Sequence, residues 1–123
     1  MTATAPVQLP ASLDAALAAL EEAGHALGSA RAWEMQLEDL RALVKRDAIE
    51  RILQTENPLT HKPHSASSAE AIVESDVDYT LHRLNQRVAV IDVDTARGRF
   101  EAAKLRAYYA AQVDAATLTT EDR

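Results

Sequence analysis

Apolar residues recur along the first half of the chain with the spacing of an amphipathic helix. Steps of three and four residues place side chains on one face of an α-helix, and such steps dominate from Leu13 onward. Ser12 lies just before the pattern and is a suitable N-cap. The pattern predicts a first long helix over residues 12–56. Its apolar positions are Leu13, Leu17, Leu20, Leu27, Trp33, Leu37, Leu40, Val44, Ala48, Ile52 and Leu53.

The phase of this pattern slips between Leu27 and Trp33, close to Gly24 and Gly28. Glycine weakens a helix interior and is common where helices bend. We therefore expect either one helix with a kink or local unwinding at residues 24–30, or two helices that meet there.

Asn57-Pro58 ends the first helical pattern, because proline lacks a backbone donor and disfavours the α conformation of the residue before it. A loop is expected over residues 57–66. Ser67-Ser68-Ala69-Glu70 then matches a capping box, in which the serine and the glutamate satisfy backbone amides at the start of a helix. The sequence predicts a second helix from residue 67.

The second half of the chain carries the most regular apolar pattern. Its positions alternate steps of four and three without a break, which is the heptad repeat of a coiled-coil seam. The pattern predicts a helix over residues 67–116, between the loop and a flexible tail at 117–123; residues 1–11 are expected to form a flexible N-terminal segment. The repeat consists of Val77, Leu81, Leu84, Val88, Ile91, Thr95, Gly98, Ala102, Leu105 and Tyr109.

Two long helices joined by a short loop favour an all-α antiparallel helical hairpin, or coiled coil. Folding the chain about residue 62 places Leu40 opposite Leu84, and pairing between chains fits the same spacing. The outer flanks of the two helices carry more apolar residues than one seam can cover. We therefore expect a homo-oligomer, a dimer or tetramer that forms a helical bundle. The predicted hairpin or oligomer seam consists of Trp33, Leu37, Leu40, Val44, Val77, Leu81, Leu84, Val88, Ile91, Leu105 and Tyr109.

Composition narrows the class of protein. Alanine supplies much of the 47% apolar content, so the seams must be thin. The chain has no cysteine, which excludes disulfides and thiolate chemistry. No apolar run approaches the ~20 residues of a membrane span, and the N-terminus lacks a signal-peptide pattern. We expect a soluble, cytoplasmic protein.

Two groups of residues have the types found in metal sites. His61 and His64 lie three apart in the loop, and Glu74, Asp78 and His82 repeat every four residues on the second helix. Two imidazoles do not complete a site, and acidic residues near a helix start are favoured by the helix dipole alone. The sequence predicts no metal, no cofactor and no catalytic residues, hence no enzyme.

Nucleic acid is an alternative partner. Arg83, Arg87, Arg97 and Lys104 fall along one flank of the second helix and could meet phosphates. Acidic residues are interspersed among them, and the net charge of −6 disfavours DNA at long range.

The loop Glu56-Asn57-Pro58-Leu59-Thr60-His61-Lys62-Pro63-His64, its continuation to Glu70, and the helix ending Phe100-Glu101-Ala102-Ala103-Lys104-Leu105-Arg106-Ala107-Tyr108 resemble small uncharacterised helical proteins of phages and prophages. This resemblance covers the second half of the chain. It implies a phage accessory context near recombination or packaging genes.

Together these features predict a non-enzymatic helical module for oligomerisation and protein interaction. It would present the loop 57–66, or the region of Gly24 and Gly28, to an unknown protein partner. The alternative is an accessory DNA-binding protein of a phage recombination or packaging module.

Overall fold

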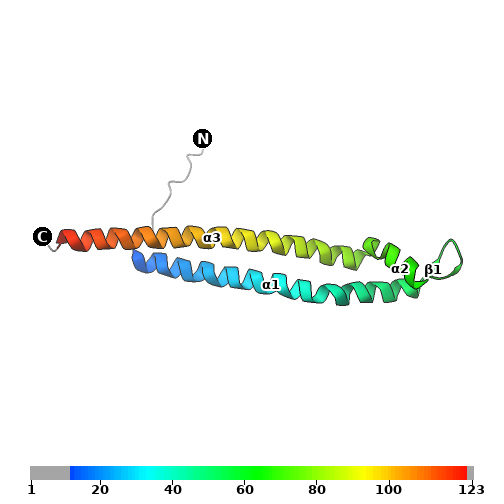
Figure 1. Ribbon diagram of the computed structural model, residues 1–123. Coiled ribbons are helices and arrows are strands. Elements are labelled where there is room, and N and C mark those ends of the chain that lie inside the picture. The colour runs from blue at the N-terminus through cyan, green and yellow to red at the C-terminus, as the bar shows by residue number, and fades with distance from the viewer. Residues whose placement is uncertain (1–11, 122–123) are drawn as a thin grey trace, which may run out of the picture. The chain divides into compact units, whose positions relative to one another are not determined.

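The chain forms a helical hairpin, as the sequence predicts (Figure 1). The computed structural model describes residues 12–121, with side chains to residue 117, so the expected N-terminal segment 1–11 lies outside the described residues. The elements in order are α1 (Leu13–Leu53), β1 (Glu56–Asn57), β2 (Lys62–Pro63), α2 (Ala66–Ile72), the 3-10 turn η1 (Val73–Ser75) and α3 (Val77–Glu121). The protein is all-α apart from the two short strands.

The hairpin comprises two compact units, which we describe separately. The loop unit is Ala30–Asp92. The terminal unit consists of residues 1–29 and 93–123, of which 12–29 and 93–121 are described. In each unit a segment of α1 packs against a segment of α3. No helix in the described part of the chain is long and apolar enough to cross a membrane.

Helix α1 runs from Leu13 to Leu53 without the break expected at residues 24–30. Ser12 caps its start, because the Ser12 hydroxyl accepts a hydrogen bond from the Ala15 amide at 3.1 Å. The apparent phase slip came from following only large side chains, whereas alanines continue the heptad through the region. The shielded positions that follow this heptad are Ala16, Leu20, Ala23, Leu27, Ala30, Glu34, Leu37, Val44 and Ala48.

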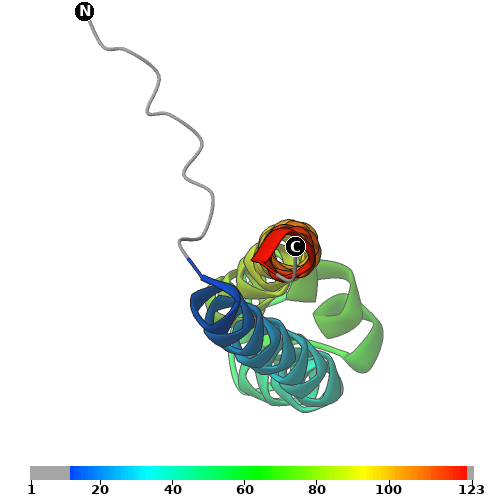
Figure 2. The same cartoon turned by 90° about the vertical axis from the view of Figure 1, so that its left-hand side faces the viewer.

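The second half of the chain is interrupted, whereas an unbroken helix over 67–116 was expected. Helix α2 ends at Ile72, and its axis does not continue that of α3 (Figure 2). The N-cap of α2 is Ser65, whose side chain accepts from the Ser68 amide at 3.2 Å, so the predicted capping box at Ser67 is wrong. Helix α3 continues to Glu121, into the expected flexible tail.

Helix α3 faces α1 with a stripe in which half of the residues are alanines, and which we call the inner stripe. Its positions follow an unbroken heptad, and every member is buried or half-buried. Most of the shielded side chains in the terminal unit are alanines, which let two helix backbones approach closely. The inner stripe consists of Tyr79, His82, Gln86, Ala89, Val93, Ala96, Phe100, Ala103, Ala107 and Ala110.

This packing corrects the predicted hairpin seam. Leu37 is buried and Val44 half-buried, but the other nine residues of that seam are exposed. As contacts within the hairpin they were assigned wrongly, because the large aliphatic residues of α3 lie on the side away from α1. That these nine residues form a surface for another chain remains a prediction. The exposed nine are Trp33, Leu40, Val77, Leu81, Leu84, Val88, Ile91, Leu105 and Tyr109.

The register of the hairpin is nevertheless the one expected from folding about residue 62. In the loop unit, the Gln86 amide donates to the Glu38 carboxylate at 2.8 Å. In the terminal unit, a Cβ added at Gly24 would lie 3.4 Å from the Phe100 ring. Both pairs are centred on residue 62, as Leu40 and Leu84 are. The sequence therefore indicated the register of the hairpin, but not which face of α3 contacts α1.

Each unit has a small core of its own. In the loop unit Ala48, Val73 and Tyr79 are almost fully buried, and Val44, Ile49 and Ile52 pack around them. In the terminal unit the core is Ala16, Ala107 and Ala110, flanked by Leu13 and Leu20. Aromatic and branched side chains thus gather next to the loop, while alanine predominates in the terminal unit.

The packing of the inner stripe predicts that neighbouring positions of α3 differ strongly in their tolerance of a larger side chain. Ala89→Leu should lower the free energy of unfolding by about 1–3 kcal/mol, because Ala89 is 1% exposed and a larger side chain would force the helices apart. Val90→Leu is the matched control, since Val90 is 49% exposed and its change should be close to neutral. Urea unfolding followed by far-UV circular dichroism measures both; equal losses would contradict the assignment of the inner stripe.

Candidate interaction surface on the second long helix

The large apolar residues of α3 form a second heptad stripe, which we call the outer stripe. At 3.6 residues per turn, its centre lies about 160° around the helix from the centre of the inner stripe. Helix α3 is therefore apolar on two nearly opposite sides, only one of which contacts α1. The outer stripe consists of Val77, Leu81, Leu84, Val88 and Ile91 in the loop unit and Thr95, Gly98, Ala102, Leu105 and Tyr109 in the terminal unit.

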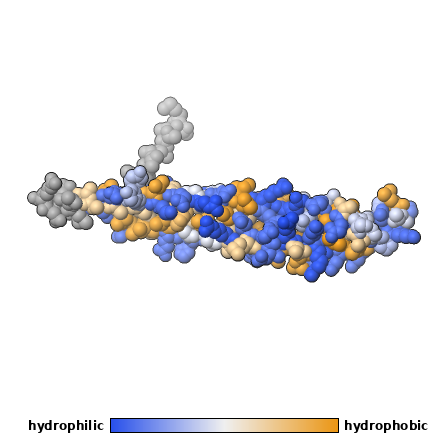
Figure 3. Space-filling view, in the orientation of Figure 1, coloured by the Kyte–Doolittle hydropathy of each residue, from blue (hydrophilic) through white to orange (hydrophobic). Residues whose placement is uncertain are grey.

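The large side chains of the outer stripe are open to solvent in both units. In the loop unit its five residues are between 47% and 70% exposed. In the terminal unit Leu105 is 59% and Tyr109 56% exposed, with the smaller Thr95, Gly98 and Ala102 before them. Apolar side chains stand among charged ones on the molecular surface (Figure 3). Large apolar side chains repeated along one helix face are typical of a protein interaction surface.

Charged residues border the outer stripe on both edges. Arg87, Asp94 and Glu101 lie along one edge, and Asp78, Asp92, Arg99 and Arg106 along the other. Within the described residues, no hydrogen bond or ion pair is made by the side chains of Arg87, Asp92, Arg99 and Arg106. Sequence reasoning did not single out Asp92, Arg99 or Arg106, although counting heptads from the apolar positions would have placed them beside the stripe.

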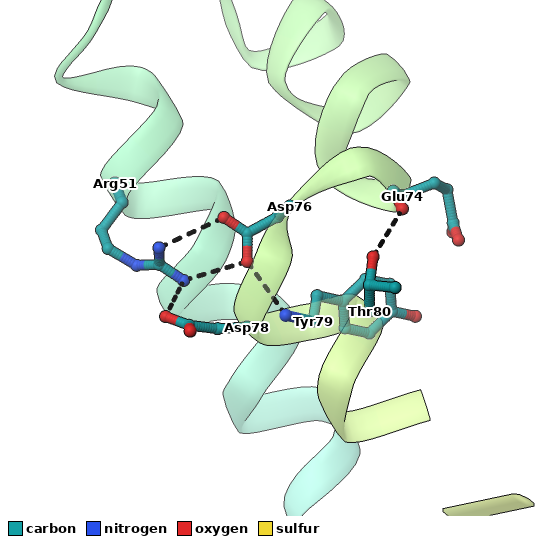
Figure 4. Close-up of polar contacts among 6 residues, drawn as sticks. All are labelled: Arg51, Glu74, Asp76, Asp78, Tyr79 and Thr80. Carbon is teal, nitrogen blue, oxygen red and sulfur yellow. Dashed lines mark hydrogen bonds and ion pairs between the residues drawn. The ribbon is translucent and has the colours of Figure 1, made fainter. Parts of the chain in front are cut away.

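A polar cluster anchors the start of α3, and with it the orientation of both stripes (Figure 4). Asp76 caps the helix, because its carboxylate accepts from the Tyr79 amide at 3.0 Å. Arg51 of α1 donates to both oxygens of the same carboxylate at 3.1 and 3.2 Å, and also lies 3.2 Å from Asp78. The cluster ties the end of α1 to the start of α3 within the loop unit.

The Tyr79 amide and the Arg51 guanidinium together hold the pKa of Asp76 below its ordinary value, against the opposing effect of burial. The Asp76 side chain is only 10% exposed, whereas the Arg51 side chain that it contacts is 50% exposed. Nearby, the Tyr79 side chain raises the pKa of the Arg41 guanidinium through a hydrogen bond. Arg83 lies over the Tyr79 ring at 5.9 Å. Tyr79 is therefore enclosed by cations from both helices.

The candidate DNA contacts are largely paired with acids. Arg83 binds Glu74, Arg97 lies 3.3 Å from Asp94, and Lys104 lies 3.5 Å from Glu101. Only Arg87 of the four lacks such a pair within the described residues. The structure thus gives most of these basic side chains a neutralising neighbour.

The two candidate metal groups are not assembled. His61 lies 3.5 Å from Glu56, while the His64 ring hydrogen-bonds Ser68 at 2.8 Å. Glu74 and Asp78 pair with arginines, and His82 reaches the Leu37 carbonyl at 2.8 Å, to which Nε2–H donates. Across residues 12–121, no group of three or more His, Asp or Glu side chains is arranged to hold a metal ion.

The loop between the long helices is an ordered turn. β1 and β2 pair antiparallel, Asn57 Oδ1 accepts from the Leu59 amide at 3.0 Å, and His61 adopts a left-handed conformation with φ of 56°. Leu59 at its tip is 90% exposed. In the other region expected to meet a partner, Gly24 accommodates the Phe100 ring, and a Cβ added at Gly28 would meet no atom within 4 Å.

Comparison with known proteins adds no relative: no family model matches the chain, and no similar protein was found among curated proteins or solved structures. The phage resemblance of the second half therefore stays an expectation.

Asp76 should contribute stability that depends on pH. Its lowered pKa favours the folded state above its unfolded pKa of about 3.9, and this contribution is lost as pH falls through the folded pKa. Asp76→Asn keeps a side chain that can cap the helix but removes the charge beside Arg51. Asp76→Ala also removes the cap and should lower the free energy of unfolding by about 1–2 kcal/mol. Urea unfolding from about pH 6 down to about pH 2 measures this. The difference between wild type and Asp76→Asn should shrink at acid pH, and a constant difference would show that the charge of Asp76 does not matter.

Proposed function

We propose that this protein is a non-enzymatic helical module that self-associates through α3. The observation that carries the proposal is the exposed outer stripe: seven large apolar side chains in heptad spacing on the side of α3 that α1 does not cover. Fully burying one such side chain is worth about 1.5–3 kcal/mol, so even partial burial over the stripe is a large driving force. A homo-oligomer, a dimer or tetramer, would remove this surface from water.

The heptad spacing of the outer stripe makes another helix the expected partner. A heptad stripe on a long helix matches the apolar side of another helix, since knobs on one fit holes on the other. The tip of the loop, with its exposed Leu59, is available for a further protein partner. The resemblance implies a phage accessory role, and the cytoplasm is the location that the sequence predicts.

Replacing Ile91 with lysine should turn the oligomer into a monomer, because Ile91 is 62% exposed on the outer stripe and lysine would bring a charge into the seam. Met35→Lys is the matched control: Met35 is 66% exposed, lies in the same unit, and belongs to α1. Size exclusion with light scattering measures the mass of each variant. A monomeric wild-type protein would refute self-association, and an Ile91→Lys oligomer of unchanged mass would move the interface elsewhere.

The DNA-binding alternative differs in its dependence on salt. The paired basic side chains predict that short single- and double-stranded DNA leaves the mass of the oligomer unchanged at low and at moderate salt. A mass increase at low salt that disappears at moderate salt would support phosphate contacts instead. Arg87→Gln then provides the check, because among the four candidates it removes the unpaired charge.

A further inference from the structure

We infer that the partner of the outer stripe is the same stripe of a second copy, with the two α3 helices parallel and in register. This inference rests on the proposed function and deepens it, because it assigns the orientation and the pairing of the interface. The apolar stripe alone fits either orientation. The charges along its two edges distinguish them.

In a parallel coiled coil, a residue on one edge of the seam faces a residue about five positions further along on the opposite edge of the partner helix. Arg87 would therefore face Asp92 of the second copy, Asp94 would face Arg99, and Glu101 would face Arg106. Every charged pair is of opposite sign, and twofold symmetry doubles each. The next pair along, Tyr108 with Val113, is apolar, and both residues are 60% exposed.

An antiparallel pair is less complementary, because it combines opposite-charge pairs with like-charge pairs. Complete overlap of the two outer stripes would place Val77 opposite Tyr109, with the twofold axis next to residue 93. In that arrangement each edge meets the same edge of the partner. Arg87 would face Glu101 and Asp78 would face Arg106, but at the centre Asp92 would face Asp92 and Asp94 would face Asp94. Like charges across a seam destabilise pairing and are a common means of excluding an orientation. Shifting the register to avoid them would leave Leu105 and Tyr109 uncovered.

The charges needed for the parallel pairs are available. Arg87, Asp92, Arg99 and Arg106 have no partner within the described residues. Asp94 and Glu101 make only surface contacts on their own helix, with Arg97 at 3.3 Å and Lys104 at 3.5 Å. Such exposed ion pairs are weak and easily exchanged. The edges thus set orientation, while the aliphatic residues supply the driving force.

Single cysteines test the orientation directly, because the natural chain has none. In a parallel, in-register dimer each residue of the outer stripe lies near its own copy, within reach of a disulfide. Leu84→Cys and Leu105→Cys, made separately and oxidised gently, should each give a covalent dimer in high yield. Val90→Cys is the control: it is exposed on α3 outside the outer stripe and should stay largely uncoupled.

The outcomes separate this inference from the proposed function. If the wild-type protein is an oligomer but only one of the two cysteines couples, or neither does, the helices are not parallel and in register, and self-association itself still holds. If the wild-type protein is a monomer by light scattering, both proposals fail. Coupling at Val90 as efficient as at Leu84 and Leu105 would show random collision and would also overturn the inference.

A charge exchange adds a second, non-covalent readout. Arg87→Glu would face Asp92 of the second copy and should weaken the dimer roughly tenfold, since two opposite-charge pairs become two like-charge pairs. The double variant Arg87→Glu with Asp92→Arg restores opposite charges and should recover the original dissociation constant. Equal weakening by the single and the double variant would contradict the assigned pairs.

Discussion

The close approach of α1 and α3 through alanine is the constraint on which the rest of this structure depends. Among the residues that the structure describes, seven of the twelve buried apolar ones are alanines, including the three that form the core of the terminal unit. Alanine gains little from burial by itself, but it brings two backbones near enough for many weak contacts. Each helix can present only one face to the other. Once α3 presents the inner stripe to α1, the large residues Leu81, Leu84, Val88, Ile91 and Leu105 must point elsewhere.

The helix ends next to the loop hold α3 in the rotation that turns the inner stripe toward α1. Asp76 starts α3 one residue after η1, and Arg51 of α1 holds the same carboxylate, so the rotation of α3 about its axis is set where the helix begins. Tyr79, buried one turn later beside Ala48 and Val73, is the largest side chain of that core. The break at residues 72–76 therefore has a structural role: it lets α3 start with a rotation that an unbroken helix from α2 would not provide.

The sequence allowed the fold class, the two long helices and the register to be predicted, because the heptad spacing and the proline at position 58 report directly on them. It did not allow the face of α3 that contacts α1 to be predicted. Large apolar residues were taken as the hairpin seam, yet in α3 they mark the surface left over after the alanines have packed. The same bias produced the false break near Gly24, where Ala23 and Ala30 continue the heptad. The α2–η1 interruption was missed because the cap at Asp76 lies inside an otherwise continuous helical pattern.

A helix with two apolar stripes in heptad spacing is hard to explain by the needs of one hairpin. A single seam requires one stripe, and the opposite side of a solvated helix is ordinarily polar. Here the charged residues between Val77 and Ala110 lie on the edges between the two stripes. Their signs are arranged so that a parallel copy meets opposite charges throughout, while a fully overlapped antiparallel copy meets like charges at its centre. The inner stripe specifies the hairpin with small residues, and the outer stripe retains the large ones that a second helix can bury. The two stripes thus divide the apolar residues of α3 between packing within the hairpin and the self-association that we propose.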